Sequence, residues 1–452
     1  MTVEGLTINS LKKKDLLTLG FMMFSIYFGA GNLIFPPALG QAAGDHTLHA
    51  MLGFMTTGIG LPLLGITAIA LAGGEYVPLL HAKTWPRFAT VLLVILYLII
   101  GPLFAMPRTG AVSFEIGIRP FLSADNLALG QIIYTAIFFA SSYYLALNPN
   151  KIIDRVGRML TPALLIVLLI LFVQAFHAPL GAILPATGAY IDAPFAQGFQ
   201  DGYQTMDLLA SIAIGALVAN AVRMRGITDS RAVGAACLVS GLITVMLMAA
   251  VYGSLAYIGA TSTSILGQAE NGGQILSAAV GIFFGSAGNL LLAVIIGLAC
   301  LTTCCGITSS AAMFFNKLLK GRVSYERLLL FSILFSFAAS NVGLTQIIAL
   351  AIPFLVTIYP LIIVFVILSL FDRFIGWRKS IYQGAMTLTL VFSLIDGLHA
   401  AGLSSEPVHA LLVAYIPFYN IMMGWVCPAV IGALVGLAVS FFQTAPAAAK
   451  ES

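Results

Sequence analysis

The residues from Gly20 to Pro37 read GFMMFSIYFGAGNLIFPP. This stretch is apolar enough to lie in a bilayer, yet it carries Gly29, Gly31 and Asn32 near its middle. Residues of these types lower helix propensity by up to about 1 kcal/mol each. We therefore expect a transmembrane helix that is interrupted over 28–32. The alternative is a continuous helix with a glycine packing face, because glycine is common in membrane helices.

The composition predicts a membrane protein. Hydrophobic residues make up 60% of the 452 residues and charged residues only 8%, whereas soluble domains carry about 25% charged residues. Apolar stretches close to the ~20 residues needed to cross a bilayer recur along the whole chain. The basic residues lie in short loops between these stretches, which argues against a nucleic-acid partner. We predict an all-α polytopic membrane protein.

The N-terminus and the cysteines predict neither a cleaved leader nor a disulfide framework. Lys12–Lys14 precede an apolar segment that is too long for a signal peptide and lacks a cleavage site directly after it. All five cysteines fall inside apolar stretches. Cys300, Cys304 and Cys305 share a predicted helix, but no His or carboxylate lies near them in sequence. We therefore interpret them as packing residues rather than metal ligands.

The apolar runs between helix breakers predict twelve transmembrane helices. A short re-entrant or surface helix is expected near 274–284, and no soluble domain is expected within the single transport domain 1–452. The predicted spans lie near 15–41, 48–73, 88–118, 127–147, 158–178, 203–222, 231–258, 285–316, 325–341, 345–371, 380–398 and 412–442.

The basic residues predict the orientation of these spans. If the N-terminus is cytoplasmic, all but two of the 21 Lys and Arg residues fall on the inner side. The exceptions are Arg108, within the third span, and Arg119, in an outer loop. Because inner loops are enriched in Lys and Arg, we expect both termini in the cytoplasm.

An interruption over 28–32 would have chemical consequences. Unpaired backbone groups at the bilayer midplane cost several kcal/mol unless they line a cavity or bind a ligand. A half-helix starting near Asn32 would direct its positive N-terminal end toward an anion such as a carboxylate. The carbonyls that end the first half, near Ser25 and Phe28, would suit a small cation.

The sixth span carries a second irregularity. Thr205 and Asp207 open an otherwise apolar run, and a carboxylate inside the membrane is a functional-site hypothesis by default. The sequence equally allows Asp207 to cap a helix near the outer water. Spans one and six hold equivalent positions if about 12–178 and 198–371 are two repeats, with helices 11 and 12 over 380–442. Paired interruptions at such positions are typical of a transporter site between the repeats.

Two further spans carry candidate polar residues. Thr308 and Ser309 offer hydroxyls to a monovalent cation, with the Cys305 carbonyl one turn earlier, but such hydroxyls also simply bond i−4 carbonyls. Arg108 and Glu115, in span three, lie two turns apart, too far for a direct pair. We expect Arg108 to face a wet cavity or an acidic partner, with a gating role for both residues. A snorkelling structural arginine is equally consistent with the sequence.

The core FGAGNLIFPP over 28–37 resembles the signature of the bacterial branched-chain amino acid:cation symporter family, the branched-chain amino acid transport system II carrier proteins. The resemblance covers essentially the whole chain. It implies import of leucine, isoleucine and valine with sodium or protons, by alternating access, across the bacterial cytoplasmic (inner) membrane. Other stretches similar to this family are Ala105–Thr109, Glu115–Gly117, Leu147–Lys151 and Gly202–Asp207.

That family belongs to the amino acid/polyamine/organocation superfamily with the leucine-transporter fold. The resemblance implies a 5+5 inverted repeat with discontinuous helices 1 and 6, followed by two C-terminal helices. Gly29–Asn32 and Thr308–Ser309 match the superfamily patterns. The resemblance implies that the backbones of Ala30 and Gly31 hold the substrate carboxylate, and we predict a substrate site formed by Ala30, Gly31, Asn32, Thr205 and Asp207. The implied sodium ligands are the carbonyls of Ser25, Phe28 and Cys305 and the hydroxyls of Thr308 and Ser309.

Sodium-coupled members of the superfamily hold a second sodium ion with an asparagine at the position of Asn32 and a threonine in span six. Whether Thr205 is that threonine is open, because span six departs from the pattern and places Asp207 close by. Proton coupling therefore stays an alternative to sodium coupling.

Other function classes fit the sequence less well. A channel should show a polar stripe along several helices, and an intramembrane enzyme should show a catalytic or metal constellation. All six histidines lie in loops or at span ends, so we expect no enzyme activity. A symporter of the same fold for another small neutral amino acid or solute, or an uncoupled facilitator, remains the alternative. The expected partners are the amino acid and the lipid bilayer, without cofactor or obligatory protein partner.

Overall fold

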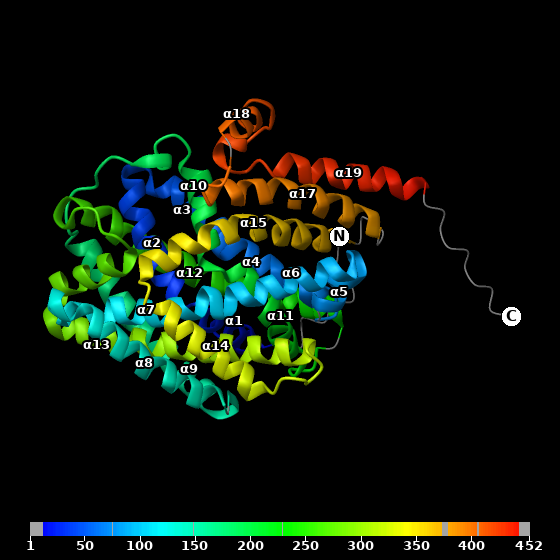
Figure 1. The fold of residues 1–452 in the computed structure, drawn as a ribbon. Helices are drawn as coiled ribbons and strands as arrows, with labels where there is room; N and C mark the ends of the chain where they lie inside the picture. The colour runs from blue at the N-terminus through cyan, green and yellow to red at the C-terminus, as the bar shows by residue number, and fades with distance from the viewer. Residues whose placement is uncertain are drawn as a thin grey trace.

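The computed structural model describes residues 12–74, 76–147, 149–227, 229–372, 378–404 and 406–442. Over these ranges the chain is helical and contains no β-strand (Figure 1). Asn148 of the motif at 147–151 and two of the basic residues predicted on the inner side, Arg373 and Lys450, lie outside the described residues.

The first half of the chain forms helices that correspond to predicted spans one to five. Span one is divided between α1 and α2, and spans two and three each contain a π-helical turn. The elements are α1 (Lys13–Tyr27), α2 (Ala30–Ala43), η2 (Gly44–His46), α3 (Thr47–Met55), η3 (Thr56–Gly60), α4 (Leu61–Leu71), α5 (Tyr76–Lys83), α6 (Pro86–Leu98), η4 (Ile99–Leu103), α7 (Ala105–Gly117), η5 (Arg119–Phe121), η6 (Ala124–Asn126), α8 (Leu127–Ala146) and α9 (Pro149–His177).

The second half begins with another divided span. The elements are η7 (Gly188–Tyr190), α10 (Pro194–Asp201), η8 (Gly202–Thr205), α11 (Asp207–Arg223), α12 (Ser230–Leu266), α13 (Gly272–Leu318), α14 (Tyr325–Ser340), α15 (Leu344–Leu370), α17 (Lys379–Ala400), α18 (Glu406–Tyr415), η9 (Tyr419–Ile421) and α19 (Val426–Phe442).

The helix lengths support a multi-pass membrane protein. In the described ranges, seven helices are long and apolar enough to cross a membrane, or eight if the bent pair at span six is one span. Other predicted spans correspond to shorter helices. For example, α1 has 15 residues, α14 has 16 and α19 has 17. The all-helical class is confirmed, whereas the count of twelve spans and the two repeats of five stay predictions.

Of two predicted segments in the C-terminal half, the first is present in the structure and the second is not a single helix. The short helix expected near 274–284 is present as the first part of α13, which is broken at Gly285 with φ of 65°. The prediction of one helix over 412–442 is wrong at its start, because α18 and α19 are separate. Phe418 and Met422 have φ of 65° and 53°, a left-handed conformation that interrupts a right-handed helix of L-residues.

The second half of span one packs on its neighbours through glycines. A Cβ atom on Gly259 of α12 would lie 2.0 Å from the Pro37 carbonyl oxygen. A Cβ on Gly40 of α2 would lie 1.9 Å from the Ala256 carbonyl oxygen, and one on Gly272 would lie 1.7 Å from that of Ile34. Small residues let membrane helices approach to backbone contact. These glycines therefore hold α2 against α12 and the start of α13.

A buried ion pair connects α5, in the first half of the chain, to Asp372, in the second half. Lys83, at the end of α5, donates from Nζ to Asp372 Oδ1 over 2.8 Å, and the hydroxyl of Tyr382 in α17 donates to the same oxygen over 2.9 Å. Both charged side chains are at most 9% exposed. The pair therefore joins α5 to the residue that follows α15, and Tyr382 adds α17, which lies beside α19 (Figure 1).

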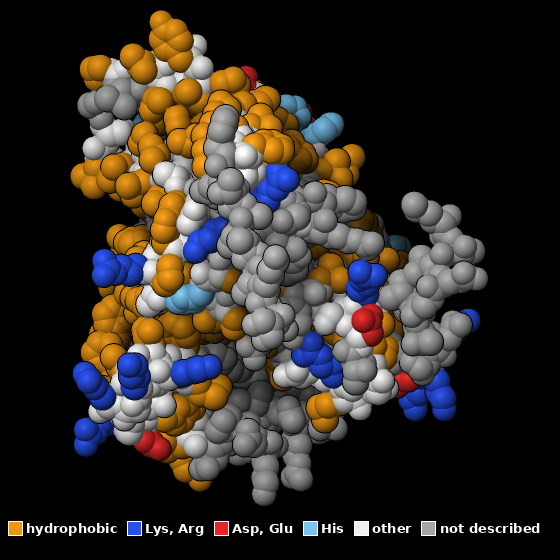
Figure 2. Space-filling view, turned by 90° about the vertical axis from the view of Figure 1, so that its right-hand side faces the viewer, with side chains coloured by type: hydrophobic (Ala, Val, Ile, Leu, Met, Phe, Trp, Pro, Cys, Tyr) orange, Lys and Arg blue, Asp and Glu red, His pale blue; other side chains and the backbone are white. Residues whose placement is uncertain are grey.

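Basic side chains gather at one end of the molecule. Figure 2 shows the end at which α5 and the last turn of α19 lie in Figure 1, and its visible surface carries more Lys and Arg than Asp and Glu. Hydrophobic side chains cover much of the adjoining surface. This distribution agrees with the asymmetry of the loops, and the assignment of this end to the cytoplasm stays a prediction.

We expect Gly259→Ala to destabilise the protein, because the new methyl group displaces backbone and overpacking costs about 1–3 kcal/mol. Gly253 lies on the same helix, and a Cβ there meets no atom within 4 Å. Gly253→Ala should therefore be neutral or slightly stabilising. Apparent melting temperatures of the two variants in detergent, compared with the wild type, check this. Equal melting temperatures would contradict the packing interpretation.

Candidate functional site

The break in span one is shorter than the sequence predicts. α1 ends at Tyr27 and α2 begins at Ala30, so only Phe28 and Gly29 are non-helical. The second half was expected to start near Asn32, and this boundary is corrected by two residues. The reason is that Asn32 Oδ1 accepts a hydrogen bond from the Gly29 N–H over 3.1 Å. This contact closes the first turn of α2 and leaves the amides of Ala30 and Gly31 at its amino end, without partners further back in the helix.

The break in span six is also present. η8 ends at Thr205, Met206 adopts a left-handed φ of 62°, and α11 begins at Asp207. The helix axis bends by 47° between the two halves. The Thr205 hydroxyl donates to the Gly202 carbonyl over 2.9 Å and lies 3.4 Å from the Asp207 N–H. Thr205 therefore stabilises the turn itself.

The two breaks meet in the interior. Asn32 Nδ2 donates to Asp207 Oδ2 over 2.7 Å, and the two residues are 2% and 4% exposed. The hydroxyl of Tyr252, from α12, hydrogen-bonds with Asn32 and donates to Asp207 Oδ2 over 3.4 Å. Asp207 is thus a buried member of a polar network, and the alternative of a helix cap facing the outer water is excluded.

Arg108 of α7 reaches the same region. Its side chain is 5% exposed, and Nη1 donates to the Gln204 carbonyl over 2.5 Å. The guanidinium lies 5.2 Å from the centre of the Phe35 ring. A Cβ on Gly31 would lie 2.9 Å from Nη2. Arg108 therefore lies beside the first turn of α2 and binds η8, the short 3-10 helix before the break of span six.

Glu115 belongs to a different cluster. Its Oε1 accepts hydrogen bonds from Arg119 Nη1 over 2.5 Å, from Asn271 Nδ2 over 3.2 Å and from Gln274 Nε2 over 2.9 Å. Asn271 also reaches Thr345 of α15 over 3.3 Å. The prediction that Arg108 and Glu115 do not pair is confirmed. Glu115 lies near the end of α7 and binds the start of α13 directly. Through Asn271 it is also connected to span ten.

The predicted cation ligands are only partly brought together. Thr308 donates to the Cys304 carbonyl over 2.6 Å and contacts Met106 Sδ of α7 over 3.5 Å. Ser309 is 4% exposed, and its hydroxyl makes no hydrogen bond in the described part of the chain. Where α13 approaches the break of span one, the neighbour of Gly29 is Thr303, with 3.5 Å between a Cβ on Gly29 and Thr303 Cγ2.

The remaining predicted ligands, Ser25, Phe28 and Cys305, come from α1, the break of span one and α13. Phe28 is buried and stacks on Phe24 with 5.0 Å between the ring centres. Ser25 is half-buried on α1, and Cys305 is buried on α13, where its thiol faces the Ser142 carbonyl of α8 over 3.6 Å. The structure thus leaves the assignment of one cation to all five residues as a prediction.

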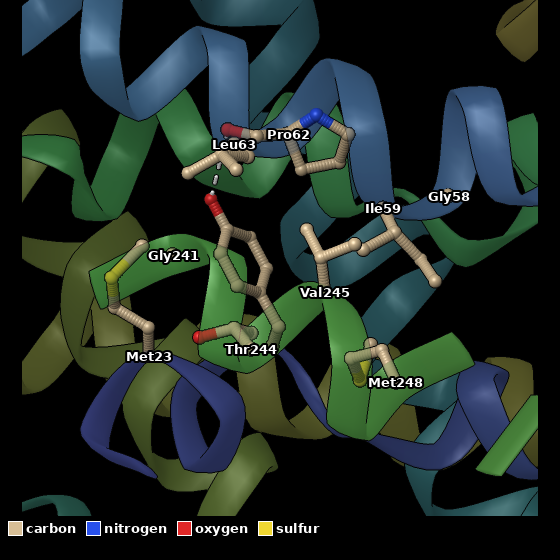
Figure 3. Close-up of a pocket in the computed structure, with 10 residues that line it drawn as sticks. Met23, Gly58, Ile59, Pro62, Leu63, Gly241, Thr244, Val245 and Met248 are labelled. Carbon is tan, nitrogen blue, oxygen red and sulfur yellow. Dashed lines mark hydrogen bonds between the residues drawn. The ribbon is translucent and has the colours of Figure 1, made fainter. Parts of the chain in front are cut away.

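A small cavity adjoins the break of span one. It has a volume of about 10 Å³, close to the minimum for one water molecule, and lies between α1, η3, α4 and α12 (Figure 3). The Tyr27 hydroxyl crosses it to donate to the Pro62 carbonyl over 3.3 Å. On its other side, Gly58 of η3 lies next to Thr205 and Tyr252, with 3.6 Å from a Cβ position to each side chain. Glycine here leaves room beside the polar network.

Sequence reasoning missed two members of the site. Tyr252 lies well inside α12, whereas the predicted span 231–258 puts it within two turns of an end, where tyrosines are common. No signal in the sequence therefore marked it. Gln204 contributes a main-chain carbonyl to Arg108, and no sequence signal marks a carbonyl as a ligand.

The chain is similar to transport proteins along its whole length. Residues 12–443 match the family model of branched-chain amino acid transport proteins. The chain is 46% identical to the branched-chain amino acid permease BraB of Bacillus subtilis, over 96% of this chain and 97% of the relative. It is 45% identical to the branched-chain amino acid transport system 2 carrier protein of Pseudomonas aeruginosa, over 92% and 94%. It is 38% identical to the permease BrnQ of Escherichia coli K12, over 97% and 98%.

The fold is similar to that of a solved transporter. Mhp1, a nucleobase-cation-symport-1 family transporter in a closed conformation with bromovinylhydantoin bound, superposes with a TM-score of 0.54. The sequences are 15% identical, and the alignment covers 94% of this chain and 92% of Mhp1. This similarity shows a shared overall fold.

We expect Asn32→Ala to destabilise the protein, because it removes the acceptor for the Gly29 N–H and the donor closest to Asp207. Buried polar groups left unpaired cost about 1–3 kcal/mol each. Asn220, which is exposed near the end of α11, provides the matched control, and Asn220→Ala should leave stability unchanged. Apparent melting temperatures in detergent check this. Equal melting temperatures of Asn32→Ala and the wild type would contradict the assignment of the network.

Proposed function

The chain belongs to the branched-chain amino acid transport protein family, and we propose that it imports leucine, isoleucine and valine together with a sodium ion or a proton. It is a transporter and not an enzyme. The observation that carries the proposal is the contact of Asn32 with Asp207. It places two interrupted membrane helices, with their free backbone groups, around one buried carboxylate.

The substrate carboxylate binds at the amino end of α2 in this proposal. The amides of Ala30 and Gly31 have no partners further back in the helix, and the helix dipole favours an anion there. Asn32, Thr205 and Asp207 complete the substrate site from the two breaks. A hydrophobic pocket distinguishes one methylene by only about 1–3 kcal/mol. We therefore expect leucine, isoleucine and valine to share the site.

The coupling cation binds between α1 and α13 in this proposal, at the carbonyls of Ser25, Phe28 and Cys305 and the hydroxyls of Thr308 and Ser309. The Ser309 hydroxyl, which has no hydrogen-bond partner within the described ranges, supports this assignment, because a buried polar group without a partner is costly unless it binds something. Movement of α1 toward α13 would complete the oxygen shell. Proton coupling through Asp207 is the alternative for the same cycle.

Transport follows from alternating exposure of this site. Cation binding favours the state open to the outside, the amino acid closes the site, and both leave into the cytoplasm. The cluster around Glu115, at the predicted outer end of span three, would hold the first turn of α13 in place while the site is closed from that side. Both termini lie in the cytoplasm in this orientation.

The first test measures uptake of labelled leucine into proteoliposomes under a sodium gradient and a proton gradient imposed separately. We expect accumulation above equilibrium with one of the two gradients, because a coupled carrier converts the gradient into substrate accumulation. Isoleucine and valine should compete, whereas glutamate and lysine should not. Equilibration without accumulation under both gradients would identify an uncoupled facilitator, and absence of leucine uptake would refute the function.

The second test concerns the cation ligands. If sodium is the coupling ion, Thr308→Ala and Ser309→Ala should each raise the sodium concentration for half-maximal uptake about 10- to 100-fold, since a lost polar ligand to a charge is worth about 1.5–3 kcal/mol. Ser240 in α12 is also a buried serine whose hydroxyl has no hydrogen-bond partner among the described residues. Ser240→Ala should leave the sodium dependence unchanged. An unaltered requirement in both test variants would remove this site.

A further inference from the structure

Two opposite charges lie buried near the breaks without pairing with each other. Arg108 comes from α7 and Asp207 from the start of α11, and they are 5% and 4% exposed. Among the described residues, the ion pairs are Lys83 with Asp372 and Arg119 with Glu115. Neither Arg108 nor Asp207 therefore has a hydrogen-bonded counter-ion among the described residues, and only their mutual attraction offsets the cost of burying the two charges. Such residues inside membrane helices are therefore expected to have a functional partner.

Arg108 offers an anion site together with the amino end of α2. Its guanidinium lies beside Gly31 and over the ring of Phe35. Nη1 donates to the Gln204 carbonyl, whereas the buried Nε–H has no hydrogen-bond partner among the described residues. The guanidinium and the first amides of α2 are two independent groups of N–H donors at one place. Carboxylates are bound by either kind of donor, and guanidinium groups bind them in a planar, directional way.

Asp207 offers the complementary cation site. Its hydrogen bonds are with neutral groups, namely the amide of Asn32 and the hydroxyl of Tyr252 at Oδ2, and the hydroxyl of Thr205. These hydrogen bonds orient the carboxylate but supply no positive charge. An ammonium group carries three N–H donors and a full charge. It would neutralise the carboxylate in an interior where water is scarce.

We propose that Arg108 and Asp207 together recognise the zwitterion of an α-amino acid. Arg108 and the α2 amides hold the substrate carboxylate, and Asp207 holds the α-ammonium group. This inference rests on the proposed function and specifies its site. It also replaces the expected gating role of Arg108 with direct binding. Because both charges of the protein are neutralised only by a ligand that carries both opposite charges, a free acid or a free amine cannot replace the amino acid.

The experiment measures competition against labelled leucine on the purified full-length protein. Leucinamide keeps the ammonium group and lacks the carboxylate, whereas 4-methylpentanoate keeps the carboxylate and lacks the ammonium group. We expect both to bind the wild type at least about 100-fold more weakly than leucine, since each leaves one buried charge unpaired. Binding of either analogue by the wild type as tightly as leucine would overturn the proposal without any variant.

Variants that remove one charge test which residue binds the carboxylate of the substrate and which binds its ammonium group. Arg108→Gln should weaken leucine binding about 10- to 100-fold and leave leucinamide binding nearly unchanged. Asp207→Asn should weaken leucine binding similarly and leave 4-methylpentanoate binding nearly unchanged. Arg108→Lys should fall between the wild type and Arg108→Gln, because lysine keeps the charge and loses the planar fork.

Matched controls carry the same changes elsewhere. Arg119→Gln removes a guanidinium from the end of α7, and Asp396→Asn removes a buried carboxylate in α17. Neither should alter the preference for leucine over the two analogues. If Arg108→Gln weakens leucine and leucinamide equally, Arg108 only positions span six and the proposal is wrong. If the wild type binds and transports no leucine, the proposed function itself fails.

Discussion

Asn32 lies in the first turn of α2 and donates to Asp207, the first residue of α11, over 2.7 Å. The same side chain accepts from the Gly29 N–H, so one amide both starts a helix and reaches across to another. An amide can do this because it carries a donor and an acceptor on one rigid group. The polar contacts of Tyr252 and Arg108 are arranged around this junction. Without it, two helix breaks would expose unpaired backbone in the interior.

The broken spans show how far the sequence allows prediction. Two glycines and an asparagine predicted the break in span one, because helix propensity is a local property. Its length was overestimated, because the sequence did not reveal that Asn32 would bond to Gly29 and extend α2 backwards. Asp207 was left between two interpretations, because sequence position alone does not give depth in the membrane. Met206 adopts its left-handed backbone without the glycine that would have marked it.

Contacts between segments that are distant in the sequence were harder to predict. That Arg108 and Glu115 lie on one helix was evident, but their partners, at Gln204 and at Asn271, come from segments far away in the chain. The assignment of Thr308 and Ser309 to a cation stays a prediction, and the sequence did not indicate that Thr303 would be the α13 residue next to Gly29. The error at 412–442 has a similar origin. Hydropathy does not register the two left-handed residues that separate α18 from α19.

The ion pair between Lys83 and Asp372 bears on how much of the chain a minimal transporter needs. The two predicted repeats end near residue 371, so a truncation there would retain all ten of their spans. It would also remove Asp372 and the Tyr382 hydroxyl, and with them the ion pair of Lys83. Because Tyr382 binds the same carboxylate oxygen as Lys83, α17 is joined to this buried pair. The last two helices therefore cannot be treated as a removable appendage.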